Sequence, residues 1–109
     1  MNYTGHEDHS ISLLDAAVMT KRFRDSQAGT GFIIAEYFGR DAISSILSQV
    51  DCVGIRLYYA LDSENVPNLV ITGVNKNGDD LCNGVLAENG LGCPTSCSVA
   101  NPLNSAWTF

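Results

Sequence analysis

The stretch that most constrains the fold runs from Cys52 to Val74 and reads CVGIRLYYALDSENVPNLVITGV. Two runs of alternating apolar residues, CVGIRLYYAL and NLVITGV, flank a short polar segment that contains a proline. This pattern is typical of a β-hairpin with one buried face. Because two strands alone are marginally stable, a third strand is expected, either over 80–86 or from another subunit. The turn signal Asn77-Gly78 favours the first of these.

Alternation also assigns the faces of the first strand, because successive side chains point to opposite sides of a sheet. The face predicted to meet the core consists of Val53, Ile55, Leu57, Tyr59 and Leu61. Arg56 lies on the other face among apolar neighbours, where a charge needs a partner. We interpret it as half of a structural salt bridge with an Asp or Glu from a helix or another chain, and a ligand-binding arginine is the alternative.

The segment before the hairpin is predicted to be helical at its start. Ser12 and Asp15 have the spacing of a capping box, with Ser12 as the N-cap. A helix from Leu13 to about Gln27 follows, and its inward side chains are expected to be Leu14, Ala17, Val18, Met19 and Phe23.

Two further segments lie between this helix and the hairpin. The run FIIAEYF, residues 32–38, shows no decisive period, and we favour a helix for it because Gly39-Arg40-Asp41 offers a break and a new start. From Asp41 to about Gln49 the apolar residues recur at helical spacing, at Ile43, Ile46, Leu47 and Val50.

These elements predict an α+β fold in which two to three N-terminal helices pack on a small antiparallel β-meander, followed by an irregular C-terminal tail. A chain of 109 residues is enough for one domain. We therefore predict a single domain over 1–109, with a polar N-terminal arm over 1–10, a globular core over 11–92 and an extended tail over 93–109.

The charge of the chain argues against two classes of partner. The net charge is −6, and only six residues are Lys or Arg. Nucleic acids and anionic membranes are bound through clustered basic side chains, so neither is expected as a partner. No run of about 18 apolar residues is present, and the polar N-terminus lacks the order of a secretory signal. We expect synthesis in the cytoplasm, and an extracellular location if the protein is released as an assembly.

Four cysteines leave three states open. A disulfide could join Cys93 and Cys97, in CPTSC, or could join Cys82 to one of them. Cys93 and Cys97 could instead complete a structural zinc site with Cys52 and Cys82. The spacing departs from the usual two pairs of cysteines separated by two residues. We favour free, partly buried thiols, with the disulfide conditional on an oxidising compartment.

Other chemistry is weakly supported by the residues. Asn75, Asn77 and Asp79 resemble the start of a calcium loop, but Asp80 stands where the loop requires glycine. The two histidines, His6 and His9, lie in the polar N-terminal segment without an evident orienting acid. We therefore expect no catalytic residues, no required cofactor and no enzymatic activity. A divalent metal held between subunits by the segment His6-Glu7-Asp8-His9 is a minor alternative.

Three segments, CVGIRLYY, LVITGV and GCPTSC, resemble a family of small uncharacterised bacterial proteins without an assigned activity. The resemblance spans about 11–97 and leaves the two ends of the chain outside it. It implies a common fold and carries no implication for function.

The function predicted from these features is self-assembly into a homo-oligomer or filament through the termini and a sheet edge. Aromatic residues are typical anchors of interfaces, and the expected anchors are Tyr3, Trp107 and Phe109. The alternative is a small ligand-binding or regulatory module whose pocket, between the helices and the hairpin, is lined by Arg56, Tyr58 and Tyr59.

Overall fold

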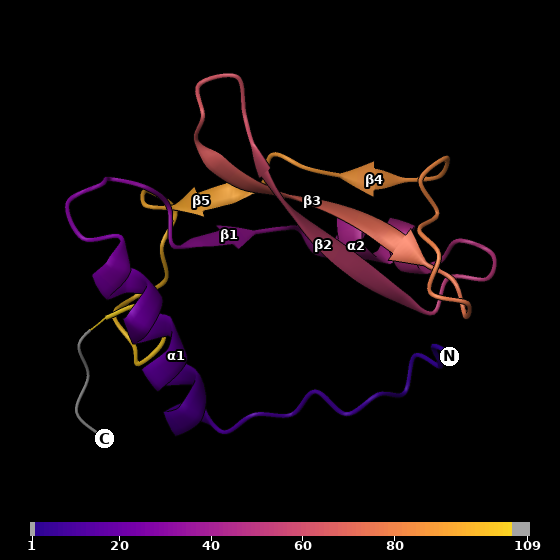
Figure 1. The fold of residues 1–109 in the computed structure, drawn as a ribbon, viewed down its shortest axis with the longest axis horizontal. Coiled ribbons are helices and arrows are strands. Elements are labelled where there is room, and N and C mark those ends of the chain that lie inside the picture. The colour runs from indigo at the N-terminus through magenta and orange to yellow at the C-terminus, as the bar shows by residue number, and fades with distance from the viewer. Residues whose placement is uncertain (1, 106–109) are drawn as a thin grey trace. The chain divides into compact units, whose positions relative to one another are not determined.

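The computed structural model describes residues 2–105 and has an α+β fold, as predicted. Its elements, shown in Figure 1, follow one another as α1 (Leu13–Ser26), β1 (Ala35–Tyr37), α2 (Arg40–Leu47), β2 (Gly54–Leu61), β3 (Pro67–Val74), β4 (Leu86–Ala87) and β5 (Leu91–Cys93). The strands form two small sheets, one of order β2-β3-β4 and one of order β1-β5.

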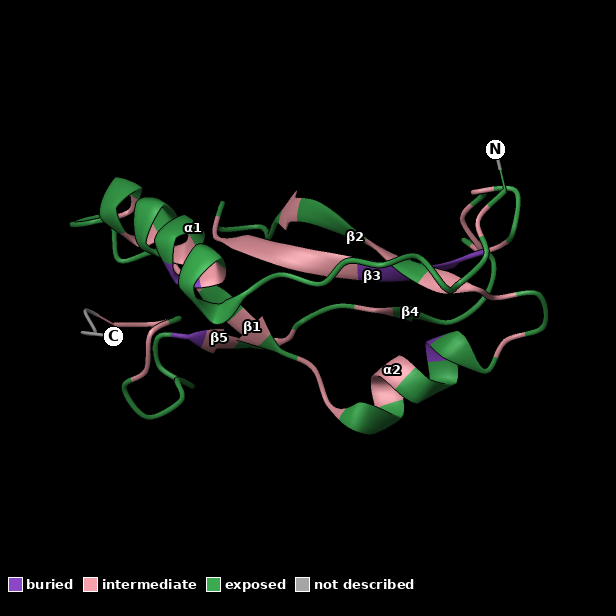
Figure 2. Cartoon of the chain, turned by 90° about the horizontal axis from the view of Figure 1, so that it is seen from below, coloured by how far each residue is buried: buried purple, intermediate pink, exposed green. Residues whose placement is uncertain are grey.

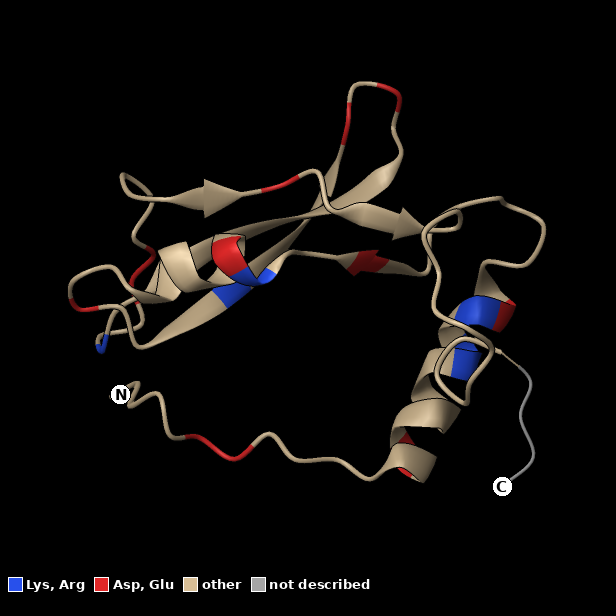
Figure 3. Cartoon of the chain, turned by 180° about the vertical axis from the view of Figure 1, so that it is seen from behind, with Lys and Arg blue, Asp and Glu red and all other residues tan. Residues whose placement is uncertain are grey.

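The described chain groups into two compact units. The first unit comprises residues 2–8 and Tyr37–Gly90, and the second comprises His9–Glu36 and residues 91–105. Nine of the twelve acidic residues but only three of the six basic residues belong to the first unit, and the positions of acidic residues are red in Figure 3. The first unit therefore carries the whole net charge of −6. That the chain is a single domain remains a prediction.

β2 and β3 form an antiparallel hairpin, as the alternating runs predict. The register pairs Gly54 with Val74 at one end and Leu61 with Pro67 at the other, so every residue of β2 has a partner on β3. β4 pairs with the other side of β3. The predicted three-stranded meander is therefore confirmed, and β2 is one of its edges.

The third strand begins later than the sequence suggests. The turn after β3 closes when the N–H of Gly78 donates to the carbonyl of Asn75. Asp80 then forms a single bridge with Val74, and the chain leaves the sheet before it returns as β4. The expected strand over 80–86 is wrong in its bounds because a loop interrupts it between Asp80 and β4.

α2 packs on the meander and contacts all three of its strands. The helix expected over 41–49 is thus confirmed, with bounds Arg40–Leu47. Its Ile46 side chain is completely buried, at 0% exposure. β3 accommodates the helix at Gly73, where an added Cβ would lie 3.3 Å from Ile46 Cγ2 and 2.9 Å from Cys52 Sγ. The absence of a side chain at Gly73 therefore permits the close approach of α2 to the sheet.

The face of β2 predicted to be buried is mostly exposed. Its large apolar side chains Ile55, Leu57, Tyr59 and Leu61 are all exposed, and Tyr59 reaches 94%. Figure 2 shows the contrast with β3, which is intermediate or buried along its length. The reason is one of size: an eight-residue helix is about 12 Å long, whereas an eight-residue strand is about 27 Å long. α2 therefore covers only part of this face.

In the second unit, α1 begins as predicted. The Ser12 hydroxyl accepts a hydrogen bond from the N–H of Asp15 at 3.1 Å, which makes Ser12 the N-cap. The predicted inward face is wrong for most of its members: among the residues of α1 only Ala17 is buried. The exposed apolar side chains include Leu14, Val18, Met19 and Phe23. Within residues 2–105, the second unit offers this helix only short strands and turns, which cover little of its surface.

The helix expected for FIIAEYF is wrong, because residues 35–37 form the strand β1 instead. β1 pairs with β5, and the N–H of the preceding Ile34 donates to the carbonyl of Cys93 at 2.7 Å. Gly92 fits closely here, since an added Cβ would lie 2.8 Å from Ile33 Cγ2. Pairing with a segment far along the chain decides the structure of this ambiguous apolar run.

The described part of the C-terminal tail, residues 94–105, consists of turns rather than an extended chain. Arg24 of α1 donates to the carbonyl of Leu103 at 2.8 Å and to that of Ser105 at 3.2 Å. Asn104 donates to the carbonyls of Ser98 and Val99. The bonds from Arg24 hold the segment against the C-terminal half of α1.

Replacing Ile46 with alanine is expected to lower the free energy of unfolding by about 2–5 kcal/mol, because it removes a fully buried side chain between α2 and β3. The matched control is Val50→Ala, since Val50 is 85% exposed and should change the stability by less than about 0.5 kcal/mol. Denaturant unfolding followed by circular dichroism measures both. Equal effects of the two substitutions would contradict the placement of α2.

Candidate functional site

Three polar side chains of the first unit form a connected group, here called the Arg56 cluster, that consists of Arg56, Tyr58 and Asp80. Arg56 Nη1 lies 2.5 Å from Asp80 Oδ1 and also donates to the carbonyl of Gly78 at 3.1 Å. The Tyr58 hydroxyl donates to the other carboxylate oxygen of Asp80. The structural salt bridge expected for Arg56 is therefore present.

The Arg56 cluster spans the width of the hairpin. Arg56 pairs with Thr72 on β3, whereas Asp80 bridges Val74 from the other side of β3. The arginine side chain therefore extends across β3 to reach the carboxylate. Thr72 and Val74, which share this face of the strand, are both buried. The cluster ties the turn after β3 to the edge strand β2.

Sequence reasoning did not identify Asp80 as the partner of Arg56. The partner acid was expected to come from a helix or from another chain, whereas Asp80 was expected to begin the third strand. The useful signal was the Asn77-Gly78 turn, since a tight turn after β3 returns the next residues alongside that strand. An acid two residues after that turn lies within reach of a long side chain on β2.

Hydrogen bonding and charge shift the pKa values in the Arg56 cluster away from neutrality. The hydrogen bond from Tyr58, followed by the bond and charge of Arg56, lowers the pKa of Asp80 below its usual value of 3.8. The hydrogen bond to Asp80 raises the pKa of Tyr58 and also that of Arg56. All three groups therefore keep one protonation state around neutral pH, which suits a structural role.

The second feature of the site is the exposed apolar surface of β2, here called the apolar edge face, which consists of Ile55, Leu57, Tyr59 and Leu61. β2 pairs with β3 on one side, and within residues 2–105 no strand pairs with its other side. Its only charged residue is Arg56. An eight-residue edge strand with exposed apolar side chains is a template for pairing with another strand.

The N-terminal arm is held against the first unit. The N–H of Tyr3 donates to the carbonyl of Lys76 at 2.7 Å, and the tyrosine ring lies so close to Gly78 that an added Cβ would meet Tyr3 Cε1. Glu7 accepts hydrogen bonds from the backbone N–H groups of Thr4 and Gly5, which lower the pKa of its carboxylate to about 2. The structure thus places Tyr3 on its own unit, and its role at an interface stays a prediction.

The two other predicted anchors, Trp107 and Phe109, lie outside the described residues. The three residues of the alternative pocket are described, but they do not converge. Arg56 and Tyr58 share one face of β2, whereas Tyr59 belongs to the apolar edge face on the opposite side.

The structure gives the cysteines two different states. Cys93 and Cys97 form a disulfide in the second unit, whereas Cys52 and Cys82 of the first unit are free thiols. Two of the four sulfurs are thus bonded to each other, and the four-cysteine zinc site is not assembled. Over residues 2–105, no three His, Cys, Asp or Glu side chains come together in a way that could hold a metal ion.

The segment that resembles a calcium loop is a hydrogen-bonded turn. Asn75 Oδ1 accepts from the N–H groups of Asn77 and Asp79, at 2.9 and 3.0 Å. This oxygen therefore stabilises the turn rather than facing an ion site.

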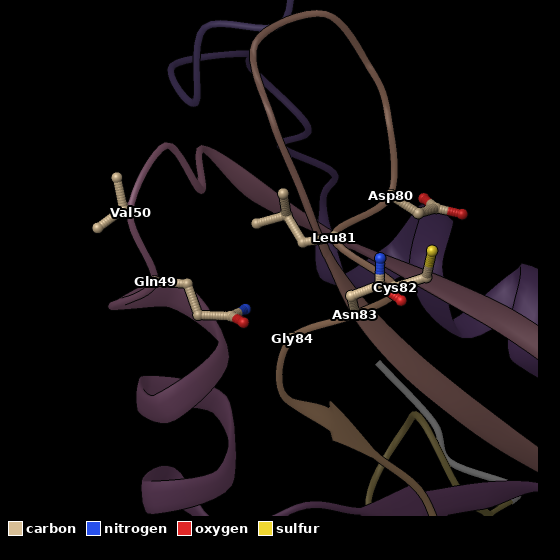
Figure 4. Close-up of a pocket in the computed structure, with 7 residues that line it drawn as sticks. All are labelled: Gln49, Val50, Asp80, Leu81, Cys82, Asn83 and Gly84. Atoms are coloured by element: carbon tan, nitrogen blue, oxygen red, sulfur yellow. The ribbon is translucent and has the colours of Figure 1, made fainter.

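A shallow hollow of about 390 Å³ lies between the end of α2 and the loop before β4, as Figure 4 shows. Its lining consists of Gln49, Val50, Asp80, Leu81, Cys82, Asn83 and Gly84. Gln49 is already used within the fold, because its side chain accepts from the N–H of Val85 and donates to the carbonyl of Ile46. The hollow includes neither Arg56 nor the tyrosines of the predicted pocket.

No family model, curated protein or solved structure matches this chain. The resemblance of CVGIRLYY, LVITGV and GCPTSC to small bacterial proteins therefore stays a prediction. Neither helix among residues 2–105 is long and apolar enough to cross a membrane.

The Arg56 cluster predicts an acid-dependent contribution to stability. Because the folded-state pKa of Asp80 is lowered, its contribution is complete above the unfolded value near 3.8 and is lost as the pH falls through the folded value. Asp80→Asn should therefore destabilise the protein at pH 7, and the difference from the unmodified protein should shrink between about pH 4 and pH 2. Denaturant midpoints measured across this range test it.

The control for this experiment is Asp79→Asn, which removes the same charge from the exposed neighbouring residue. It should have a smaller effect at neutral pH. A difference between Asp80→Asn and the unmodified protein that stays constant from neutral pH down to about pH 2 would contradict the role of the Asp80 carboxylate.

The cysteine assignment predicts the result of alkylation. Unfolded in denaturant without reductant, the protein should gain two alkyl groups, on Cys52 and Cys82, and it should gain four after reduction. Intact-mass spectrometry distinguishes the two counts. Four adducts in protein that was oxidised in air and never reduced would argue against the Cys93–Cys97 disulfide.

Proposed function

We propose that this chain is a non-enzymatic interaction protein that self-assembles into a homo-oligomer or larger assembly through the free edge of β2. The observation that carries the proposal is the eight-residue edge strand β2, which pairs on one side only among residues 2–105 and carries the apolar edge face. Exposed, long and apolar edges pair with other strands unless charge or a covering element prevents it. Within the described residues no strand covers the outer edge of β2, and its single charge is neutralised by Asp80.

The Arg56 cluster supports a structural rather than a catalytic role. A general acid or base works best with a pKa near the working pH, which usually requires a raised carboxylate pKa or a lowered tyrosine pKa. Here the pKa of Asp80 is lowered and that of Tyr58 is raised. The cluster instead holds β2 in place and leaves its outer edge available.

The disulfide supports the expected extracellular location of the assembly. Disulfides persist mainly in oxidising compartments and are rare in the cytoplasm. The Cys93–Cys97 bond therefore favours an assembly that acts outside the cell after synthesis in the cytoplasm. Involvement of the termini, and of Trp107 and Phe109 in particular, is a further part of the proposal.

Replacing Tyr59 with lysine tests the proposal, because lysine on an edge strand opposes strand pairing. Tyr59 is 94% exposed, so the substitution should leave folding intact. The unmodified protein should sediment above the monomer mass of 11.7 kDa, and Tyr59→Lys should sediment at that mass. Analytical ultracentrifugation over a concentration series measures both.

The matched control is Val50→Lys, which adds the same charge at a similarly exposed apolar residue away from the edge. It should keep the mass of the unmodified protein. If the unmodified protein stays at 11.7 kDa at every concentration, the proposal is wrong; if Tyr59→Lys assembles as well as Val50→Lys, β2 is not the surface involved.

A further inference from the structure

We infer that two copies of this chain join β2 to β2 in antiparallel orientation, around a two-fold axis at Leu57, to form one continuous six-stranded sheet. The inference rests on the proposed function and specifies its surface, its partner and its register. Each copy contributes a meander of order β2-β3-β4, so the two edges meet in the middle of the joint sheet. The pairing is isologous, because the same residues are used on both sides.

Charge limits where two copies can meet. The first unit carries the net charge of −6, so two copies repel each other over most of its surface. β2 contains no carboxylate, and the apolar edge face beside it is uncharged. At the free edge of β2, two acidic units can therefore approach each other without bringing carboxylates face to face.

The residue order of β2 is self-complementary about Leu57. An axis at Leu57 places Ile55 opposite Tyr59 of the partner subunit, and Leu57 opposite Leu57 of the partner subunit. Residues directly opposite share a face of the sheet, so the two apolar edge faces become continuous. Pairs of an aromatic and a β-branched side chain across neighbouring strands are stabilising.

On the other face of the joint sheet, the same register places Arg56 opposite Tyr58 of the partner subunit, so the two arginines do not face each other. Arg56 and Tyr58 both reach Asp80 within their own subunit, on the side of β3 away from the seam. The charge of each edge strand therefore stays paired inside its own copy.

Neighbouring registers lose these matches. An axis at Arg56 would place the two Arg56 side chains directly opposite each other, and like charges in that position are destabilising. An axis at Tyr58 would place Ile55 opposite Leu61 of the partner subunit, which loses the pair formed by Ile55 and the ring of Tyr59. A register between two residues would set the apolar edge face of one copy against the Arg56 face of the other.

A single cysteine at the axis tests the register, because only there does a residue face itself. In a Cys82→Ser background, Leu57→Cys should form a disulfide-linked dimer under mild oxidation, seen as a shift from 11.7 kDa to twice that mass on a non-reducing gel. Directly opposed residues of antiparallel strands have Cα atoms about 4.5–5.5 Å apart, within the range that a disulfide spans.

Two further variants make the test independent of any one substitution. Ile55→Cys and Tyr59→Cys should each cross-link poorly alone but should cross-link to each other when mixed, because the register pairs these two positions. The Cys82→Ser parent, which retains Cys52, sets the background level.

The outcomes separate the inference from the proposed function. If ultracentrifugation shows an assembly but neither Leu57→Cys nor the mixture cross-links above the background, the register is wrong and self-assembly stands. If the protein is a monomer and the thiol of the Leu57→Cys variant reacts slowly with a maleimide, the edge is covered within the chain and both proposals are overturned. If it is a monomer and that thiol reacts fast, the edge is free without self-pairing, and both are again overturned.

Discussion

The ladder between β2 and β3 is the interaction on which the rest of the first unit depends. β3 sits between β2 and β4, and its last four residues are buried. α2 packs on one of its faces at Gly73, while the Arg56 side chain crosses the other to reach Asp80. Each of these contacts requires the observed register, because a slip of one residue would exchange the two faces of the strand.

In this arrangement β3 has a neighbouring strand on each side, whereas within residues 2–105 β2 has one on a single side. α2 is too short to cover the hairpin, so the apolar side chains of β2 stay exposed although the strand is well paired on one side. Burying them against a second copy would extend the same hydrogen-bonding pattern and remove apolar surface from water. The Arg56 cluster contributes by pairing the single charge of β2 within its own subunit, so the edge strand presents no unpaired charge to its partner.

The local elements were predictable from the sequence, whereas the contacts between distant segments were not. Alternation specified the hairpin, and the hydroxyl of Ser12 specified the start of α1. The strand at 35–37 depends on pairing with β5, and the partner of Arg56 lies twenty-four residues away at Asp80. Which face of β2 is buried depends on the length of α2, and alternation alone carries no information about that length.

Amide hydrogen exchange of β2, followed by NMR at low and high protein concentration, tests edge pairing most directly. In an edge strand, alternate N–H groups point away from the sheet and exchange freely. The account predicts that these alternate amides within Gly54–Leu61 become protected as the concentration rises, while the amides of β3 that face β2 are protected throughout. Exchange from β2 that is equally fast at every concentration, in protein that ultracentrifugation shows to be assembled, would contradict it.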